Sequence, residues 1–413
     1  MRVSAPAKII RLFVPRNVAP LPSIPFRRLA AIYFAYFAFV GAFSPYFGLY
    51  LQSIGQAAWQ IGVLLSLTQL TRIVAPYLWA ALADRRGWRA RLLVVTIAGS
   101  ILAYAGVFAT TSFAGLFVVL AAFGFFGAAT MPITESITLA SLHGQIGRYG
   151  HIRLWGSVGF IAAVFCFGWM LDRVAIENLL WMILAPLLAT FLLAVTLRDA
   201  PTVGAPPRQP IWPDLGRPEV VALLAANVLM NVAHGPLYAF YSIYLFDAGY
   251  SKTAIGALWS LGVVAEIAVF LTAPWWMKRF PVHDILLASF ALAVGRFAII
   301  GWGVESPVLL AAAQLAHAAT FGACHMASIA LVNRWFAGSR QVRGQALYLA
   351  LSFGLGGFLG VIGSGVAWSA IGPAWTFTAA SAAAGAGLIL LTRHAKLLRR
   401  ASPSLVVDAT TPQ

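Results

Sequence analysis

The chain has 413 residues, of which 61% are hydrophobic and only 10% are charged. Soluble proteins carry roughly 25% charged residues, so the 28 Lys and Arg and 12 Asp and Glu of this chain are too few to cover a soluble surface. Most of the surface must face lipid, which excludes a soluble enzyme, a DNA-binding domain and a secreted disulfide scaffold. The net charge of +16 lies mostly in short clusters between apolar runs, as in the cytoplasmic loops of polytopic membrane proteins.

Apolar runs long enough to cross a bilayer recur along the whole chain. A spanning helix takes about 20 residues. We predict an all-α polytopic membrane protein of twelve transmembrane helices in two six-helix bundles, residues 28–197 (the N-terminal half) and 219–392 (the C-terminal half). Cytoplasmic tails at 1–27 and 393–413 and a Pro-rich cytoplasmic linker at 198–218 complete the chain. The predicted spans are 28–50, 60–83, 91–111, 113–141, 151–171, 177–197, 219–247, 254–277, 284–304, 307–335, 343–370 and 374–392.

Basic residues gather on one side of the predicted spans. Counted over tails and loops, 23 Lys and Arg lie on the side of the N-terminus, and Arg173 and Lys252 lie on the other. Because cytoplasmic loops are enriched in Lys and Arg, both termini are predicted to be cytoplasmic.

The two predicted halves are related in sequence. A shift of 194 positions places Tyr50 on Tyr244 and Gly62 on Gly256, and it gives nine identities in the 24 positions from 50 to 73. Two such six-helix repeats are the plan of the major facilitator superfamily, whose substrate site lies between the halves near the bilayer midplane. Chance similarity between two apolar hairpins is the alternative explanation.

A basic cluster with a glycine turn follows the second predicted span. Residues 79–91 resemble the signature between the second and third helices of this superfamily, which implies a conformational gate made by Asp84, Arg85, Gly87 and Arg89. The leading glycine of the signature is alanine in this chain, and the equivalent spot in the C-terminal half lacks the aspartate. An ordinary positively charged loop is the alternative.

Five charged side chains fall inside predicted spans: Arg72, Glu135, Arg153, Glu266 and Arg296. A charge at the centre of a span costs about 2.5–3.5 kcal/mol on insertion scales, so these side chains are predicted to face the interior. Arg72 and Glu266 are 194 positions apart and are predicted to form a charge pair across a central cavity. Glu135 and Arg153 flank one short loop and can also pair. Two alternatives to a functional role remain: Glu135 and Arg153 form a purely structural pair, or the Arg153 side chain extends to the membrane–water interface.

The interior charges favour an anionic ligand. Three arginines against two glutamates leave one positive charge, and Arg296 has no acidic residue in its own span. Such a cation suits a carboxylate, although water or a backbone carbonyl could satisfy it instead. A buried glutamate can bind and release a proton as its surroundings change, which proton coupling requires. His234, His317 and His325 also fall inside spans, where hydrogen-bonded packing is their alternative role.

Aromatic residues crowd the first and seventh predicted spans, which line the cavity in this fold. Packing or a membrane-interface belt is the alternative. The residues are Tyr33, Tyr36, Phe37, Tyr46, Phe47, Tyr50, Tyr238, Tyr241 and Tyr244.

Three longer runs, 149–160, 258–266 and 317–325, resemble the phenylpropionate permease family of this superfamily, and the similarity extends from 29 to 391. The resemblance implies a monomeric importer in the bacterial inner membrane. It also implies a transporter without a cofactor, which uses the proton gradient to take up 3-phenylpropionate or a similar aromatic carboxylate. The expected partners are substrate, protons and the bilayer, and no nucleic acid.

A more distant similarity to lactose permeases implies roles for single residues. The sugar-binding glutamate and arginine match Glu135 and Arg153, a ninth-helix arginine matches Arg296, and a tenth-helix histidine falls near His317. The tryptophan that stacks on galactose is Phe160 in this chain, which makes galactoside transport doubtful. The tenth-helix carboxylate that carries the proton has no counterpart.

These arguments predict a substrate site in which arginines meet a carboxylate and aromatic side chains hold the ring. Symport of a neutral sugar or nucleoside, export, and a sensor of the same fold are the alternatives. An intramembrane enzyme would need a His-Glu-x-x-His or Gly-x-Ser-x-Gly motif, and neither is present. The predicted substrate-binding residues are Glu135, Arg153, Arg296, Tyr46, Phe160, His234, Tyr241 and His317. The predicted proton-coupling residues are Glu266, Glu135 and His317.

Overall fold

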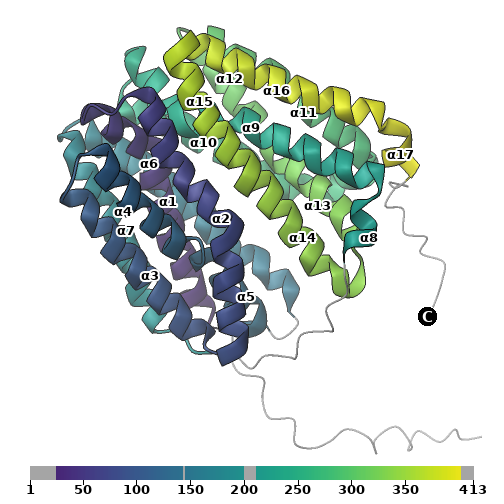
Figure 1. The fold of residues 1–413 in the computed structure, drawn as a ribbon, viewed down its shortest axis with the longest axis horizontal. Coiled ribbons are helices and arrows are strands. Elements are labelled where there is room, and N and C mark those ends of the chain that lie inside the picture. Colours follow the sequence, from purple (N-terminus) through teal and green to yellow (C-terminus); the bar gives the residue numbers. More distant parts are fainter. Residues whose placement is uncertain (1–24, 143–144, 200–210, 401–413) are drawn as a thin grey trace, which may run out of the picture.

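The computed structural model describes residues 25–142, 145–199 and 211–400, without the side chains of 84–86, 146, 212–213 and 400. Within these ranges the chain is helical and contains no strand (Figure 1). Twelve of the helices described there are long and apolar enough to cross a membrane, which confirms the predicted all-α fold.

The twelve spans follow one another through short connections. The first six are built from α1 (Phe26–Ser53), α2 (Ala58–Arg86), α3 (Arg89–Ala105) with η1 (Gly106–Phe108), α4 (Phe113–Gly127) with α5 (Thr130–Ser141), α6 (Tyr149–Leu171), and η3 (Ile176–Asn178) with α7 (Leu179–Val195). The next three are α9 (Pro218–Asp247), α10 (Lys252–Arg279) and α11 (Val282–Trp302). The last three are α12 (Pro307–His317) with η4 (Ala318–Ala323) and α13 (Cys324–Trp335), then η5 (Gly338–Arg340) with α14 (Gln341–Leu349), η6 (Ala350–Gly356) and α15 (Gly357–Ile371), and finally α16 (Pro373–Arg393). Among the described residues, three short helices lie outside the spans: η2 (Ile146–Arg148), α8 (Trp212–Leu215) and α17 (Ala395–Arg400).

Two spans contain a π-helical segment, η4 in the tenth span and η6 in the eleventh. A π-turn adds one residue to a turn of α-helix and is frequent at functional sites. The rings of Phe321 in η4 and Phe353 in η6 meet edge to face with centroids 5.9 Å apart. The two segments therefore lie side by side in the C-terminal half.

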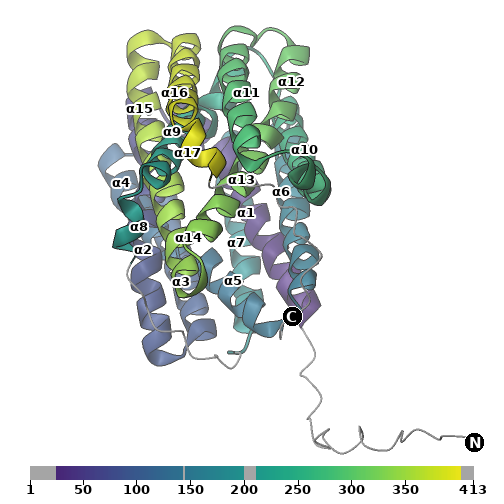
Figure 2. The same cartoon turned by 90° about the vertical axis from the view of Figure 1, so that its right-hand side faces the viewer.

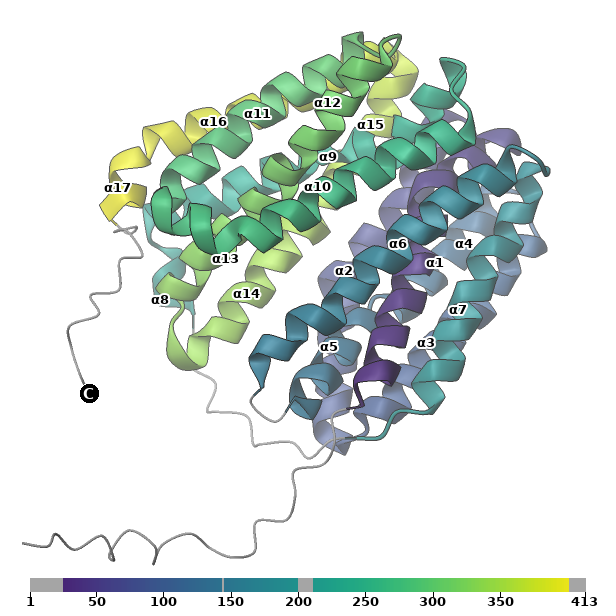
Figure 3. The same ribbon diagram turned by 180° about the vertical axis from the view of Figure 1, so that it is seen from behind.

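The two halves lie against each other along three helix pairs: α1 with α9, α2 with α15, and α6 with α10 (Figures 1 and 3). The spans of both halves run roughly parallel (Figure 2). Glycines allow the close backbone approach. A Cβ on Gly62 in α2 would lie 2.8 Å from Gly365 Cα in α15, and one on Gly256 in α10 would lie 2.6 Å from the Val164 carbonyl oxygen in α6. Gly62 and Gly256 are related by the 194-residue shift, so both halves of the repeat provide a glycine contact of this kind.

Hydrogen bonds join the halves at the end of the bundle opposite the linker, where α1 and α9 end. Gln52 donates to Asp247 at 3.1 Å. Asp172, which follows α6, accepts from the backbone N–H groups of Lys252 at 2.7 Å and Thr253 at 2.9 Å, and from the Thr253 hydroxyl at 2.5 Å. Partial burial opposes ionisation of Asp172, but these hydrogen bonds outweigh it and hold the pKa of its carboxyl below the ordinary value. Toward the linker the ribbons of the two halves lie farther apart (Figure 3).

Candidate functional site

Arg296 lies in the middle of α11 and is 1% exposed. Its Nε donates to the Ala313 carbonyl oxygen at 2.8 Å, and its Nη1 donates to the Thr320 hydroxyl at 3.0 Å and lies 3.2 Å from His234 Nε2. Within the described residues none of these partners is a carboxylate. Because an arginine stays protonated in proteins, the centre of the C-terminal half carries a positive charge without an ion-pair partner.

The hydrogen bonds of His234 are those of a neutral imidazole. Its Nδ1 lies 2.8 Å from the Met230 carbonyl oxygen, which can only accept, so Nδ1 carries the proton. Nε2 is then free to accept from Arg296 at 3.2 Å. A charged His234 would place a second donor against the guanidinium, so the geometry selects the neutral form.

An aromatic stack runs from this arginine toward the linker end. His317, Phe321 and His325 follow one another at four-residue intervals through η4, and their rings are nearly parallel. The centroids of His317 and Phe321 are 5.2 Å apart, and those of Phe321 and His325 are 6.5 Å apart. His234 lies 5.9 Å from His317, which connects the stack to Arg296. The π-helix thus brings three rings and the Thr320 hydroxyl to one side of the C-terminal half.

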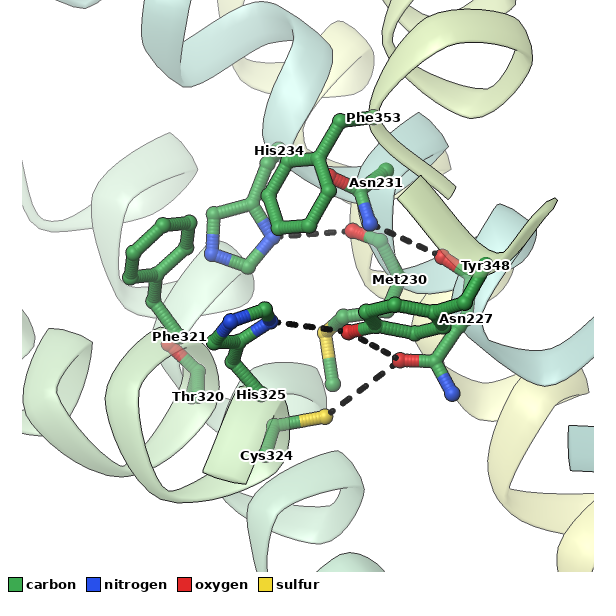
Figure 4. A pocket seen from close by; sticks show the side chains of 10 residues that line it. All are labelled: Asn227, Met230, Asn231, His234, Thr320, Phe321, Cys324, His325, Tyr348 and Phe353. Carbon is green, nitrogen blue, oxygen red and sulfur yellow. Dashed lines mark hydrogen bonds between the residues drawn. The ribbon is translucent and has the colours of Figure 1, made fainter. Parts of the chain in front are cut away.

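A second polar network lies at the linker end of this stack (Figure 4). Asn227 Oδ1 accepts from the Ser328 hydroxyl at 3.1 Å and from the Tyr348 hydroxyl at 3.5 Å, and the Tyr348 oxygen lies 3.0 Å from His325 Nδ1. The Asn231 amide donates to the Asn227 carbonyl oxygen at 3.0 Å. These residues, except Ser328, line a small cavity between α9 and the π-helical spans. The cavity offers amide, hydroxyl and imidazole groups next to aromatic rings.

Sequence reasoning identified His325 but missed the other members of this network. Asn227 and Asn231 are four residues apart in an otherwise apolar span, with His234 three residues further on, so all three share one helical face. This shared face is the sequence pattern that could have identified Asn227 and Asn231 as members of a polar site. Tyr348 and Ser328 had none, because neither residue type is unusual in a membrane helix.

In the N-terminal half, Arg153 faces aromatic rings. Its guanidinium carbon lies 4.2 Å from the ring centre of Phe37 and 5.8 Å from that of Tyr33. Glu135 accepts a hydrogen bond from the Tyr149 hydroxyl at 3.2 Å and is near enough to Arg153 to interact electrostatically. No direct ion pair joins Glu135 to Arg153 in the described part of the chain. Their pairing and their role in binding stay predictions.

Glu266 lies on α10, fifteen residues into the helix (Lys252–Arg279). Its Cγ would lie 3.2 Å from a Cβ on Gly322 in η4, and Arg153 of the other half is near enough to attract its carboxylate without forming an ion pair in the described chain. Arg72 is exposed and donates to Gln69 on its own helix at 3.0 Å. Among the described residues no ion pair joins Arg72 to Glu266 in this conformation, so their pairing stays a prediction.

The aromatic residues predicted to hold a substrate ring occupy different environments. Tyr46 is buried, and its hydroxyl donates to the Val164 carbonyl oxygen at 2.6 Å toward the end of the bundle opposite the linker. Tyr241 is also buried and meets Trp259 edge to face at 5.9 Å. Phe160 is 9% exposed. The structure does not bring the three rings together around Arg296, and their role in binding stays a prediction.

The predicted conformational gate lies at the turn from α2 to α3. Gly87 ends α2 with φ of +67°, a left-handed conformation that favours glycine, and its N–H donates to the Ala83 carbonyl oxygen at 2.8 Å. Arg89 begins α3. The side chains of Asp84 and Arg85 lie outside the described part of the structure, so gating by this motif stays a prediction.

The sequence profile of the family described as "MFS_1 like family" matches residues 26–379. The chain belongs to the major facilitator superfamily. This transporter is 33% identical to the protein named "Probable 3-phenylpropionic acid transporter" of Escherichia coli (strain K12), over 83% of this chain and 93% of that protein. It is 27% identical to the maltose permease of Geobacillus stearothermophilus, over 78% and 83% of the two chains. A solved structure of a variant of the nucleoside transporter NupG matches the fold with a TM-score of 0.79 at 18% identity, covering 90% of this chain and 99% of that one.

The predicted family is thereby confirmed, and the protein is a transporter of small molecules rather than an enzyme. Transporters of this superfamily need no cofactor. Within the residues that the structure describes, no three His, Cys, Asp or Glu side chains are grouped to hold a metal ion.

Proposed function

We propose that this transporter imports a small aromatic carboxylate, 3-phenylpropionate or a close analogue, together with protons. Arg296 is the observation that carries the proposal. Its hydrogen-bond partners in the described chain are neutral, so its charge remains available to an anion. An aromatic ring lies next to it: the Phe297 ring centre is 5.2 Å from its guanidinium carbon. The name of the Escherichia coli relative points to the same class of substrate.

Glu266 is the proton carrier in this proposal. It lies on α10 beside Gly322 of η4, and Arg153 on α6 of the other half is near enough to attract its carboxylate. Protonation neutralises Glu266 and frees Arg153 to meet the substrate carboxylate together with Arg296, whereas loss of the proton restores the attraction. Proton binding and substrate binding are then coupled through one arginine. Glu135, which is bonded to Tyr149, and His317 are the alternative carriers.

The proposal includes a monomer in the bacterial inner membrane with both termini in the cytoplasm. The distribution of 23 Lys and Arg against two supports this orientation. In that orientation the end joined by Asp172 and Thr253 faces the outside. The structure then represents a state closed to the outside, from which substrate is released into the cytoplasm.

Nucleoside transport is the second candidate. The cavity in Figure 4 favours it, because Asn227 and Asn231 offer amide groups beside the rings of Phe321 and His325. Such a site suits a neutral, planar base as well as a phenyl ring.

Uptake into proteoliposomes distinguishes the candidates. The purified protein is reconstituted and given radiolabelled 3-phenylpropionate, uridine or maltose, with and without an inward proton gradient. We expect 3-phenylpropionate alone to accumulate above its external concentration, and a protonophore to abolish the accumulation. Accumulation of uridine instead would identify a nucleoside, not the acid, as the substrate. Accumulation that is equal with and without the proton gradient would contradict proton coupling.

A further inference from the structure

Four buried polar atoms near Arg296 have no hydrogen-bond partner within the part of the chain that the structure describes. They are Nη2 of Arg296 itself, Nε2 of Gln314, Nδ1 of His317 and the hydroxyl oxygen of Tyr241. All four side chains are at most 8% exposed. A buried polar atom without a partner is costly, so four of them in one region indicate groups that a ligand or water satisfies at another stage of transport.

Three helices supply these groups, and a fourth, α10, packs against them. Gln314 and His317 lie three residues apart on α12 and face Gly262 in α10, where a Cβ would lie 3.1 Å from Gln314 Oε1 and 3.5 Å from His317 Cδ2. Arg296, from α11, bonds to the carbonyl oxygen of the residue before Gln314. Tyr241, from α9, lies near the Gln314 side chain, but the two groups do not reach hydrogen-bond geometry. The sequence analysis gave no role to Gln314.

The chemistry of this cluster is that of a donor set. The Gln314 amide nitrogen and the Arg296 Nη2 can only donate, and the Tyr241 hydroxyl can donate. A carboxylate accepts at several positions on its two oxygens, whereas a neutral amide fills part of the same space with a donor of its own. No carboxylate side chain hydrogen-bonds to these groups in the described chain. The cluster therefore fits a carboxylate from outside the protein.

We propose that Gln314 and Tyr241 form, with Arg296, the subsite that binds the substrate carboxylate and selects organic acids over their neutral analogues. The inference rests on the proposed function. It adds Gln314 to the binding site and assigns the hydroxyl of Tyr241, already a predicted binding residue, to the carboxylate of the substrate. Because the cluster is buried behind α10, the carboxylate reaches it when α10 moves away from α12. Gly262 has no side chain to hold the two helices together at that contact.

The test compares 3-phenylpropionate with 3-phenylpropanamide, its neutral amide, by calorimetric binding to the purified full-length protein. Gln314→Glu keeps the shape of the side chain but replaces two donor hydrogens by a negative charge. Tyr241→Phe removes one oxygen and keeps the ring contact with Trp259. Gln345→Leu and Tyr104→Phe are matched controls, since they remove an amide bonded to Asn333 and a hydroxyl bonded to Leu180, away from the cluster.

We expect the wild-type protein and both controls to prefer the acid at least tenfold. Gln314→Glu is expected to lose this preference, and Tyr241→Phe to reduce it about threefold to tenfold, with affinity for the amide unchanged. If the wild-type protein prefers the acid and both cluster variants keep the full preference, the subsite is overturned while the proposed function stands. If the wild-type protein shows no preference for the acid, the proposed function fails together with the inference. Thermal unfolding of each variant verifies the fold, and Tyr241→Phe alone decides the matter if Gln314→Glu does not fold.

Discussion

At the scale of single residues, the partners of Arg296 explain why this position needs the guanidinium group. Nε and Nη1 point in fixed directions, one toward the carbonyl oxygen of Ala313 and the other toward Thr320 and His234. A guanidinium offers five donors in a planar fork, and two of them can bind both oxygens of a carboxylate at once. Lysine concentrates three donors on one atom and cannot reproduce this arrangement.

Arg296→Lys is therefore expected to weaken binding of 3-phenylpropionate at least tenfold, although the charge is kept. A hydrogen bond to a charged group contributes about 1.5–3 kcal/mol, and about 1.4 kcal/mol corresponds to a tenfold change in affinity. Calorimetry on the purified variant measures the effect. Arg173→Lys, on an exposed loop arginine, is the control and should bind as the wild type does. Equal affinity in Arg296→Lys would remove Arg296 from the binding site.

Glu266→Gln keeps the size of the side chain but cannot bind and release a proton. We expect proton-driven accumulation to be lost or strongly reduced, while exchange of labelled for unlabelled substrate across the proteoliposome membrane survives better. Glu135→Gln is the comparison for a carboxylate that also binds substrate, and it should impair both activities. Unchanged accumulation in Glu266→Gln would shift the proton-carrying role to Glu135 or His317.

At the scale of helices, the N-terminus of α10 is capped by a residue from the other half of the molecule. The first N–H groups of a helix lack intrahelical partners. Those of Lys252 and Thr253 are taken by Asp172, while Ser251 caps the next one, on Ala254, at 3.1 Å. The carboxylate also interacts favourably with the positive end of the helix dipole. This contact must break whenever the two halves separate at this end.

Asp172→Ala is expected to shift the protein toward conformations that are open at the end opposite the linker. The backbone N–H groups of Lys252 and Thr253 would lose their acceptor, so hydrogen–deuterium exchange in residues 250–256 should become several times faster. Glu177→Ala, which removes an acidic side chain from the same connection, is the control and should leave exchange unchanged. Protection equal to that of the wild type in Asp172→Ala would show that the glycine contacts alone keep this end closed.

The same contact makes a prediction about pH. Because the folded pKa of Asp172 lies below the ordinary value, the ionised carboxylate stabilises the contact above that ordinary value, and the contribution is lost as pH falls through the folded pKa. The contact therefore does not titrate between about pH 5 and 8. Asp172→Asn should change the rate of 3-phenylpropionate uptake but not the shape of its pH profile in that range. A changed shape would mean that Asp172 takes part in proton coupling.

At the scale of the whole molecule, the fold is predictable because lipid leaves the backbone little choice. Each apolar run must satisfy its own N–H and C=O groups inside the membrane, and a helix does so within one segment. The π-helical segments η4 and η6 are not predictable in this way, since adding one residue to a turn leaves the hydropathy of the span unchanged. They nevertheless decide where Thr320, Phe321 and Phe353 point.

The candidate site is predictable only as far as charge reveals it. A charged residue inside a span must face the interior, which identifies Glu266 and Arg296 from the sequence. Which arginine pairs with Glu266 depends on side-chain direction, which hydropathy does not encode; Arg72 donates to Gln69 on its own helix. Gln314 was missed because an uncharged amide barely alters the hydropathy of its span.

The orientation of the whole bundle is the last prediction, and it rests on 23 Lys and Arg against two. Both termini and the linker are expected to face the cytoplasm, so reporter fusions after Asp214 and after Arg393 should be active only as cytoplasmic reporters. A cysteine introduced at Glu177, between α6 and α7, should react with a membrane-impermeant maleimide added outside intact cells, once native Cys166 and Cys324 are replaced by serine. A periplasmic signal from either fusion would reverse the orientation. The end closed by Asp172 would then face the cytoplasm, and the structure would represent a state open to the outside.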